Sequence, residues 1–251
     1  MTSTVNDHLV LISGESASGK SASLMNIPNQ ERWMYLNCEA GKRLPFRNQF
    51  KSFTITDPYQ VYEAFNATRP GGPMHDKIDG IIIDTVTFLM DMFESQYVLN
   101  SANSMKAWGD YAQFFKNLMQ DYVASSDKAV IILGHTRAEV DEATMTARTA
   151  VPIKGSLKNN GVESYFSTVV STKKVSIKEL ENYSNDLLNV TPHDEMLGYK
   201  HVFQTQITKA TVGERIRSPM GMFTVKETYI DNDAFLLLNH LNAYYGDPVV
   251  A

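Results

Sequence analysis

Short apolar runs alternate with longer amphipathic stretches along this chain. Five runs are typical of buried strands, because each is short and largely apolar: residues 9–13, 33–36, 53–56, 80–84 and 129–134. A helical pattern covers residues 88–123, with an expected break near residues 100–104. Its second half carries an apolar stripe at spacings of three and four, which predicts packing on a sheet: Trp108, Tyr111, Phe115, Leu118 and Tyr122. This alternation predicts an α/β fold, with a mainly parallel, twisted sheet and helices on both faces.

The later part of the chain has a different pattern. Residues 135–160 are polar and predict a long loop or a β-excursion. Residues 167–175 and 201–208 alternate like strands, which predicts a late antiparallel extension of the sheet. Between them, about residues 178–198 are polar and indicate a surface insertion. A last amphipathic helix is expected over residues 233–245, with Asp233 as its cap. We expect one domain over residues 1–251.

Composition narrows the classes of function. The chain has 251 residues, 43% apolar and 20% charged, with a net charge of −5, so contact with nucleic acid requires local basic loops. The single cysteine, Cys38, excludes an intramolecular disulfide and favours a reducing compartment. No apolar run approaches the roughly 20 residues that span a bilayer, and residues 1–8 lack a secretory pattern. We therefore expect a cytoplasmic protein with no membrane partner.

The segment from Gly14 to Ser21 matches the phosphate-loop pattern G-x-x-x-x-G-K-[ST] throughout. Its glycines allow a tight turn whose N–H groups face a phosphate, and the helix expected after it adds its positive end. Lys20 is expected to bridge the β- and γ-phosphates of ATP, and the Ser21 hydroxyl to bind Mg²⁺. An ordinary Gly-Ser turn does not account for the position directly between a strand and a helical stretch. The predicted nucleotide-binding set is Gly14, Glu15, Ser16, Ala17, Ser18, Gly19, Lys20, Ser21 and Ala22.

Asp84 ends the apolar run of residues 80–84. An acid at the carboxyl end of a buried strand lies where open α/β sheets bind their ligands. We expect Asp84 to hold Mg²⁺ together with Ser21, directly or through water. The alternative is an aspartate that only caps the following helix.

The order of these parts resembles the RecA-like P-loop ATPase core, and within it the phage-encoded RecA-like ATPases of recombination and single-strand annealing. The similarity covers about residues 9–223. It rests on five landmarks in order: the phosphate loop, Glu39 after the second strand, Asp84 followed by Thr85, His135 after the strand of residues 129–134, and the basic segment of residues 209–219. RecA itself has a glutamine at the fourth landmark, and this chain lacks the extra terminal domains of RecA.

The resemblance implies a role for each landmark. Glu39 corresponds to the catalytic glutamate, and His135 to the polar residue that senses the γ-phosphate. The late basic segment corresponds to a hairpin that reaches the nucleotide of a neighbouring subunit, with Arg215, Arg217 and Lys209 as candidates in that order. Each has an alternative: a surface acid, a structural histidine and a solvated basic edge. Hydrolysis requires a group that orients or deprotonates water, which favours the catalytic role of Glu39.

The resemblance also places single-stranded DNA on the loops after the Asp84 and His135 strands. The candidate phosphate contacts are Arg137, Arg148, Lys154 and Lys158, with Lys106 in the earlier loop. Tyr97 or Tyr165 is a candidate for stacking on bases. Glu139, Asp141 and Glu142 lie in the same segment and repel phosphates, so a mobile loop of mixed charge is the alternative.

Together these features predict an ATPase that depends on Mg²⁺ and binds single-stranded DNA in phage-type recombination or annealing. The resemblance implies that it acts as a ring or filament of identical subunits, in the host cytoplasm if a phage encodes it. A single-strand-binding protein is a further partner that it suggests. The alternatives are a DNA helicase or other RecA-like motor, a small-molecule (nucleotide) kinase, and a nucleotide switch without catalysis.

Overall fold

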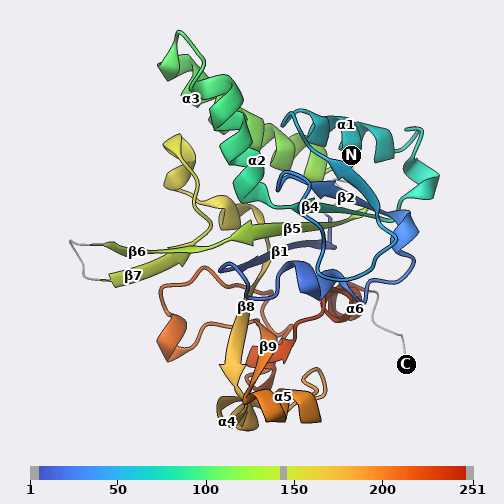
Figure 1. Ribbon diagram of the computed structural model, residues 1–251, viewed down its shortest axis with the longest axis vertical. Coiled ribbons are helices and arrows are strands. Elements are labelled where there is room, and N and C mark those ends of the chain that lie inside the picture. The colour runs from blue at the N-terminus through green and yellow to red at the C-terminus, as the bar shows by residue number, and fades with distance from the viewer. Residues whose placement is uncertain (1–5, 142–145, 247–251) are drawn as a thin grey trace.

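The computed structural model describes residues 6–141 and 146–246. Its main sheet has eight strands in the order β10-β9-β8-β1-β5-β4-β2-β3 (Figure 1). All neighbouring pairs from β3 to β8 are parallel, and the β8–β9 and β9–β10 pairs are antiparallel. The strands are β1 (Leu9–Gly14), β2 (Trp33–Asn37), β3 (Lys51–Thr54), β4 (Gly80–Asp84), β5 (Ala129–His135), β8 (Thr168–Ser176), β9 (Tyr199–Gln204) and β10 (Tyr229–Asp231). The expected α/β fold with a late antiparallel extension is confirmed.

Helices cover both faces of this sheet (Figure 1). The helices α1 (Gln60–Thr68), α2 (Val86–Phe93) and α3 (Ser104–Asn117) lie on one face, and α6 (Ala234–Tyr245) lies on the other. The helix α2 continues into a π-helical turn at Glu94–Val98, and α3 continues into another at Leu118–Val123. The expected break lies between Val98 and the start of α3 at Ser104. In the predicted stripe, Tyr111, Phe115 and Leu118 are buried, and Trp108 and Tyr122 pack against the same core.

The central strands are apolar throughout because both of their faces are covered. Val10 and Ile12 pack in the core beneath α6, whereas Leu11 packs in the core beneath α2 and α3. In β4, Ile82 faces the first of these cores, and Ile81 and Ile83 face the second. Successive side chains of a strand point to opposite faces, so a continuous apolar run fills two cores at once. This arrangement fixes the carboxyl ends of the central strands at one edge.

Several predicted boundaries differ from the structure. The strand β3 lies two residues earlier than expected, and β9 ends at Gln204, so residues 205–208 are not in a strand. The predicted insertion contains two short helices, α4 (Ile177–Leu180) and α5 (Pro192–Leu197). Leu180 is buried in a small cluster with residues of β8, β9 and β10, so this segment completes a satellite core. Asp233 caps α6 as predicted, since its carboxylate accepts hydrogen bonds from the backbone N–H groups of Phe235 and Leu236.

The prediction of a helix after the phosphate loop was wrong. Only a four-residue 3₁₀ turn, Ser21–Leu24, follows the loop. Pro28 disfavours helical backbone at Ile27, and Asn29 adopts a left-handed conformation with φ of 49°, so a longer helix cannot continue. A helix dipole therefore adds little to anion binding at this loop, and its backbone N–H groups and Lys20 carry that role.

The two basic segments of the late chain are also organised differently from expectation. The strands β6 (Arg137–Asp141) and β7 (Thr146–Ala150) form an antiparallel pair directly after β5, which confirms the β-excursion; Glu142 lies outside the described residues. Residues 209–219 do not project as a hairpin. The N–H of Thr149 donates to Gly213 O at 2.9 Å, and Arg217 exchanges two backbone hydrogen bonds with Val169. The segment lies along β7 and β8 because its backbone groups find partners there.

No helix within residues 6–141 and 146–246 combines the length and the apolar character needed to cross a membrane.

Candidate functional site

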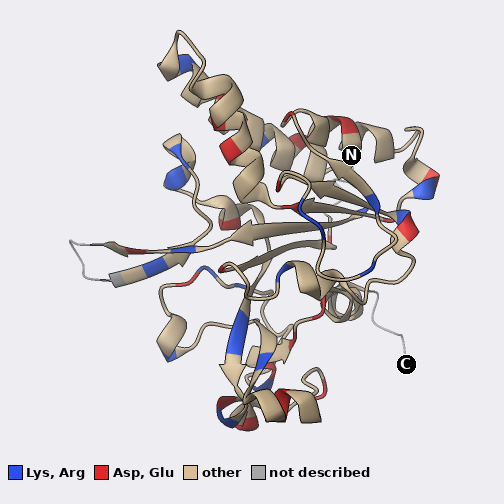
Figure 2. Ribbon diagram, viewed as in Figure 1, with Lys and Arg blue, Asp and Glu red and all other residues tan. Residues whose placement is uncertain are grey.

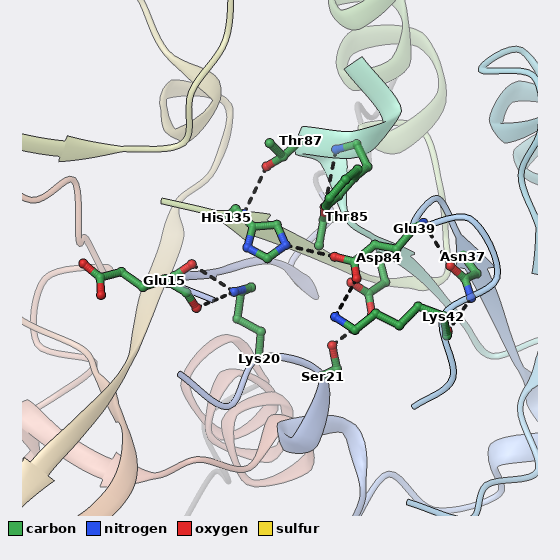
Figure 3. A network of polar contacts seen from close by, with 12 residues as sticks. Glu15, Lys20, Ser21, Asn37, Glu39, Lys42, Asp84, Thr85, Thr87 and His135 are labelled. Atoms are coloured by element: carbon green, nitrogen blue, oxygen red, sulfur yellow. Dashed lines mark hydrogen bonds and ion pairs between the residues drawn. The ribbon is translucent and has the colours of Figure 1, made fainter. Parts of the chain in front are cut away.

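The phosphate loop lies at the carboxyl end of β1, beside the carboxyl ends of β2, β4 and β5 (Figure 3). A cavity of about 500 Å³ opens there. Residues from six segments line it, including Lys20 and Ser21 of the loop, Tyr35, Glu39, Asp84, His135, His201 and Asn232. Parallel strands therefore bring together the first four landmarks, which are separated by up to 121 residues in sequence (14 to 135).

The loop backbone requires glycine at two positions. A β-carbon on Gly14 would collide with the Thr172 side chain. Gly19 has a φ of +113°, and a β-carbon there would lie 2.8 Å from the Asn232 amide nitrogen. The loop thus turns tightly against β8 and the end of β10, as the pattern of glycines predicts.

Lys20 lies inside the loop. Its Nζ donates to Gly14 O at 2.9 Å and to Glu15 O at 2.7 Å, and the residue is 5% exposed. Burial lowers the pKa of Lys20 to about 8, although the nearby Asp84 and Glu39 carboxylates oppose that shift. Lys20 is therefore still mainly protonated at neutral pH, and it places a buried ammonium where a phosphate would enter the loop.

Asp84 is held from two sides and keeps one oxygen unpartnered. Its Oδ2 accepts hydrogen bonds from Ser21 Oγ at 3.1 Å and from the Tyr35 hydroxyl at 2.7 Å. Its Oδ1 is buried and has no hydrogen-bond partner among the described residues. Burial raises the pKa of Asp84, and the hydrogen bond from Tyr35 opposes that rise. A buried polar atom without a partner requires an explanation, and a carboxylate oxygen beside a serine hydroxyl suits Mg²⁺.

Glu39 lies between two hydrogen-bond donors, His135 and Lys42 (Figure 3). Its carboxylate accepts hydrogen bonds from His135 Nε2 at 2.9 Å and from Lys42 Nζ at 2.8 Å, and its side chain is 9% exposed. The hydrogen bond from His135, together with Lys42, lowers the pKa of Glu39 to about 2. A carboxylate of such low pKa can orient a water molecule but is a weak proton acceptor at neutral pH. The second and fourth landmarks of the resemblance are thus in direct contact.

The three late cations lie outside the nucleotide cavity of their own chain. Arg215 donates to Asn160 O at 3.0 Å and forms an ion pair at 3.3 Å with Glu163, whose side chain is 2% exposed. Arg217 and Lys209 are exposed, and neither lines the cavity at the phosphate loop. Their proposed role toward a neighbouring subunit stays a prediction.

The four predicted DNA contacts line a second cavity, of about 610 Å³. Arg137 and Arg148 lie on β6 and β7, Lys154 and Lys158 lie in the segment after them, and Arg215 also lines the cavity. Figure 2 shows basic positions on this β-strand pair and on the segment that follows it. Lys154 pairs with Glu94, and Lys158 lies 3.5 Å from Glu139.

The other residues considered for DNA binding are not part of this cavity. Lys106 lies on α3 and faces Asp110 at 3.8 Å. Tyr97 donates to Asp57, and Tyr165 packs edge-on against Phe115. Neither tyrosine lines the cavity, so the expected aromatic stacking platform is not found there.

Three residues that shape the site were not predicted from the sequence: Tyr35, His201 and Asn232. Tyr35 was assigned to a core strand, although a hydroxyl near the carboxyl end of that strand was a usable signal. His201 Nδ1 donates to Ser18 O at 2.7 Å, and the Asn232 amide donates to Gly19 O at 2.9 Å. Nothing in the local pattern marks these two residues, because they lie on β9 and just after β10, about 180 and 210 positions away in sequence (18 to 201 and 19 to 232).

A family model described as AAA domain matches residues 7–213. The search of curated proteins gives no match. The flagellar accessory protein FlaH from Methanocaldococcus jannaschii is 10% identical, with a TM-score of 0.38, over 80% of this chain and 78% of that chain. A second solved structure, described as an ATPase domain, is 11% identical, with a TM-score of 0.42, over 91% of this chain and 86% of that chain. With TM-scores this low, the two structures carry no argument about function.

Replacing Tyr35 by Phe tests how Asp84 is positioned. The ring keeps its stacking on Phe50, at 6.0 Å, but the hydrogen bond to Asp84 Oδ2 is lost. We expect the Mg²⁺ concentration needed for ATP binding to rise about tenfold, because losing a group that orients a metal ligand typically costs that much or more. A Mg²⁺ titration of ATP binding measures it. Tyr62→Phe, whose hydroxyl donates to Phe114 O elsewhere, is the control. Identical Mg²⁺ dependence in both variants would contradict the assignment.

Proposed function

This chain belongs to the AAA domain family, and we propose that it binds ATP with Mg²⁺ at the phosphate loop and hydrolyses it. One observation carries the proposal: Glu39 shares a cavity with Lys20 and with the Ser21–Asp84 pair. A phosphate-binding lysine, a pair of metal ligands and a carboxylate that can orient water are the parts that phosphoryl transfer to water requires.

Each residue would have a separate task. Lys20 and the loop N–H groups hold the β- and γ-phosphates, and Ser21 with Asp84 Oδ1 would hold the metal. When bound, Mg²⁺ neutralises charge on the phosphate oxygens. Glu39 aligns a water molecule whose oxygen bonds to the γ-phosphorus, while the bond to the bridging oxygen breaks with ADP as the leaving group. The proton that the water loses passes to an oxygen of the separated phosphate. His135 and Lys42 fix the orientation of Glu39 through their two hydrogen bonds.

Glu39→Gln tests this mechanism. Glutamine keeps the size of the side chain but removes the charge that holds and orients water. We expect ATP affinity to survive and turnover to fall by about 10² or more. Equilibrium ATP binding and steady-state release of phosphate measure the two effects. Glu31→Gln, an exposed acid that does not line the cavity, is the control and should hydrolyse ATP normally. Normal turnover by Glu39→Gln would return Glu39 to a structural role.

We further propose that single-stranded DNA binds along the cavity beside β6 and β7, and that the protein acts in recombination or annealing. Five basic residues of the described part of the chain line it, although the chain has a net charge of −5. This cavity is also connected to the nucleotide site, since β6 begins two residues after His135, which holds Glu39. A bound DNA strand that displaced β6 would move His135 and thereby change the orientation of Glu39. A single-strand-binding protein as partner stays a prediction.

The salt dependence of DNA binding tests this cavity. Arg137→Gln combined with Lys158→Gln should weaken binding to single-stranded DNA and reduce the slope of log affinity against log salt by about 1.4, since each phosphate contact contributes about 0.7. Fluorescence anisotropy at several salt concentrations measures it. Lys106→Gln is the control, because Lys106 is an exposed lysine outside the cavity. The same slope in all three proteins would place the DNA elsewhere.

We also propose that neighbouring copies of the chain complete the nucleotide site with a cation. Arg217 is now the first candidate, because it is exposed and has no ion-pair partner among the described residues. Lys209 is also exposed, whereas Arg215 would have to leave the buried Glu163 carboxylate unpaired.

Mixing two inactive variants tests the contribution of a neighbour. Arg217→Ala should bind ATP but hydrolyse it about 10³-fold more slowly, because a cation supplied in trans stabilises charge in the transition state. Lys20→Ala should not bind ATP tightly. A mixture should regain activity, since some sites would join an intact loop to an intact Arg217. Activity in the mixture that never exceeds the sum of its parts, with full activity of the dilute monomer, would contradict the proposal.

A further inference from the structure

A third cavity, of about 600 Å³, adjoins the nucleotide cavity. It lies along the loop of residues 41–48, which follows Glu39, and its far wall includes Ser52 and Thr54 of β3. Five residues line both cavities: Tyr35, Lys42, Arg43, Leu44 and Pro45. The two spaces therefore meet along one short stretch of chain, and we call the third cavity the 41–48 groove.

The 41–48 groove is basic. Lys42, Arg43 and Arg47 line it, and none of its described lining residues is Asp or Glu. Lys42 is held by Glu39, but Arg43 and Arg47 are exposed and have no ion-pair partner among the described residues. Three cations within six residues make the groove locally positive, although the whole chain has a net charge of −5.

The walls of the groove also supply neutral hydrogen-bond donors. Asn48, Ser52 and Thr54 contribute an amide and two hydroxyls. The start of the loop is held in place by Asn37: its amide donates to Lys42 O at 2.8 Å, and its Oδ1 accepts from Glu39 N–H at 2.9 Å. Guanidinium groups with hydroxyl donors suit an oxyanion such as phosphate, which accepts several hydrogen bonds at once.

The groove begins at the residue proposed to orient the attacking water. Lys42 Nζ lies 2.8 Å from Glu39 Oε2 and lines both cavities. In the proposed reaction, water attacks the γ-phosphorus from the Glu39 side, so the phosphate product forms beside the entrance to the groove. ADP stays on the phosphate loop, and the separated phosphate has Arg43 and then Arg47 as the next cations along the loop.

We propose that Arg43 and Arg47 make the 41–48 groove a phosphate-binding site, which receives the inorganic phosphate released from ATP. This role rests on the proposed hydrolysis, whereas the binding of phosphate in the groove can be measured without it.

The first experiment measures phosphate binding alone. Inorganic phosphate is titrated by calorimetry into the full chain saturated with Mg²⁺-ADP, so that the phosphate loop is occupied. We expect one phosphate site, weakened about tenfold by Arg47→Gln, since a hydrogen bond to a charged partner contributes about that much. Arg69→Gln, an exposed arginine that lines neither cavity, should bind phosphate like the wild type. Equal affinity in the two variants would overturn the site.

The second experiment tests the source of the phosphate. Inorganic phosphate should inhibit steady-state hydrolysis, and Arg47→Gln should require about tenfold more phosphate for the same inhibition. If the wild type does not hydrolyse ATP, the proposed function fails while the calorimetric result on the groove stands. If AMP binds the groove more tightly than phosphate, and Arg47→Gln weakens AMP binding as well, the product role is overturned. The groove would then bind a phosphorylated acceptor instead.

Discussion

The hydrogen bonds on the Asp84 carboxylate determine how the rest of the site is arranged. Asp84 is 2% exposed at the carboxyl end of a central strand, and a charge in such a place is costly unless it is paired. Tyr35 and Ser21 donate to one of its oxygens, and the charge of Lys42 favours its ionised form. The second oxygen has no partner among the described residues. A bound cation would remove this cost, which couples nucleotide loading to the electrostatics of the fold.

The order of strands explains why the remaining residues converge on this carboxylate. The strand β5 lies between β1, which carries the phosphate loop, and β4, which ends in Asp84. His135 therefore emerges between the two, and it reaches Glu39 at the end of β2. The chain after His135 immediately forms β6 and β7, and the chain after Glu39 forms the 41–48 groove. One hydrogen bond thus connects the two cavities that flank the nucleotide site.

The parts of this arrangement that depend on local sequence could be predicted. The two clearest strands end within one residue of their expected positions, because an apolar run buried on both faces has a strong pattern. The phosphate loop could be predicted from its pattern of Gly, Lys and Ser, and Asp84 from its position at the end of an apolar run. The helix after the loop was wrong because Pro28 and Asn29 end it after one turn, although the pattern up to Leu24 suits a helix. The prediction of a late hairpin was wrong because the backbone of residues 209–219 pairs with β7 and β8, and no short sequence pattern reveals partners that distant. His201 and Asn232 could not be predicted either, because they contact the phosphate loop from distant parts of the sequence.

The most direct test of the account is the rate of phosphate release from Mg²⁺-ATP by the full chain, measured with and without single-stranded DNA and compared with Lys20→Ala. The wild type is expected to hydrolyse ATP, whereas Lys20→Ala is not, and single-stranded DNA is expected to raise the wild-type rate. A wild-type rate equal to that of Lys20→Ala, with and without DNA, would contradict it.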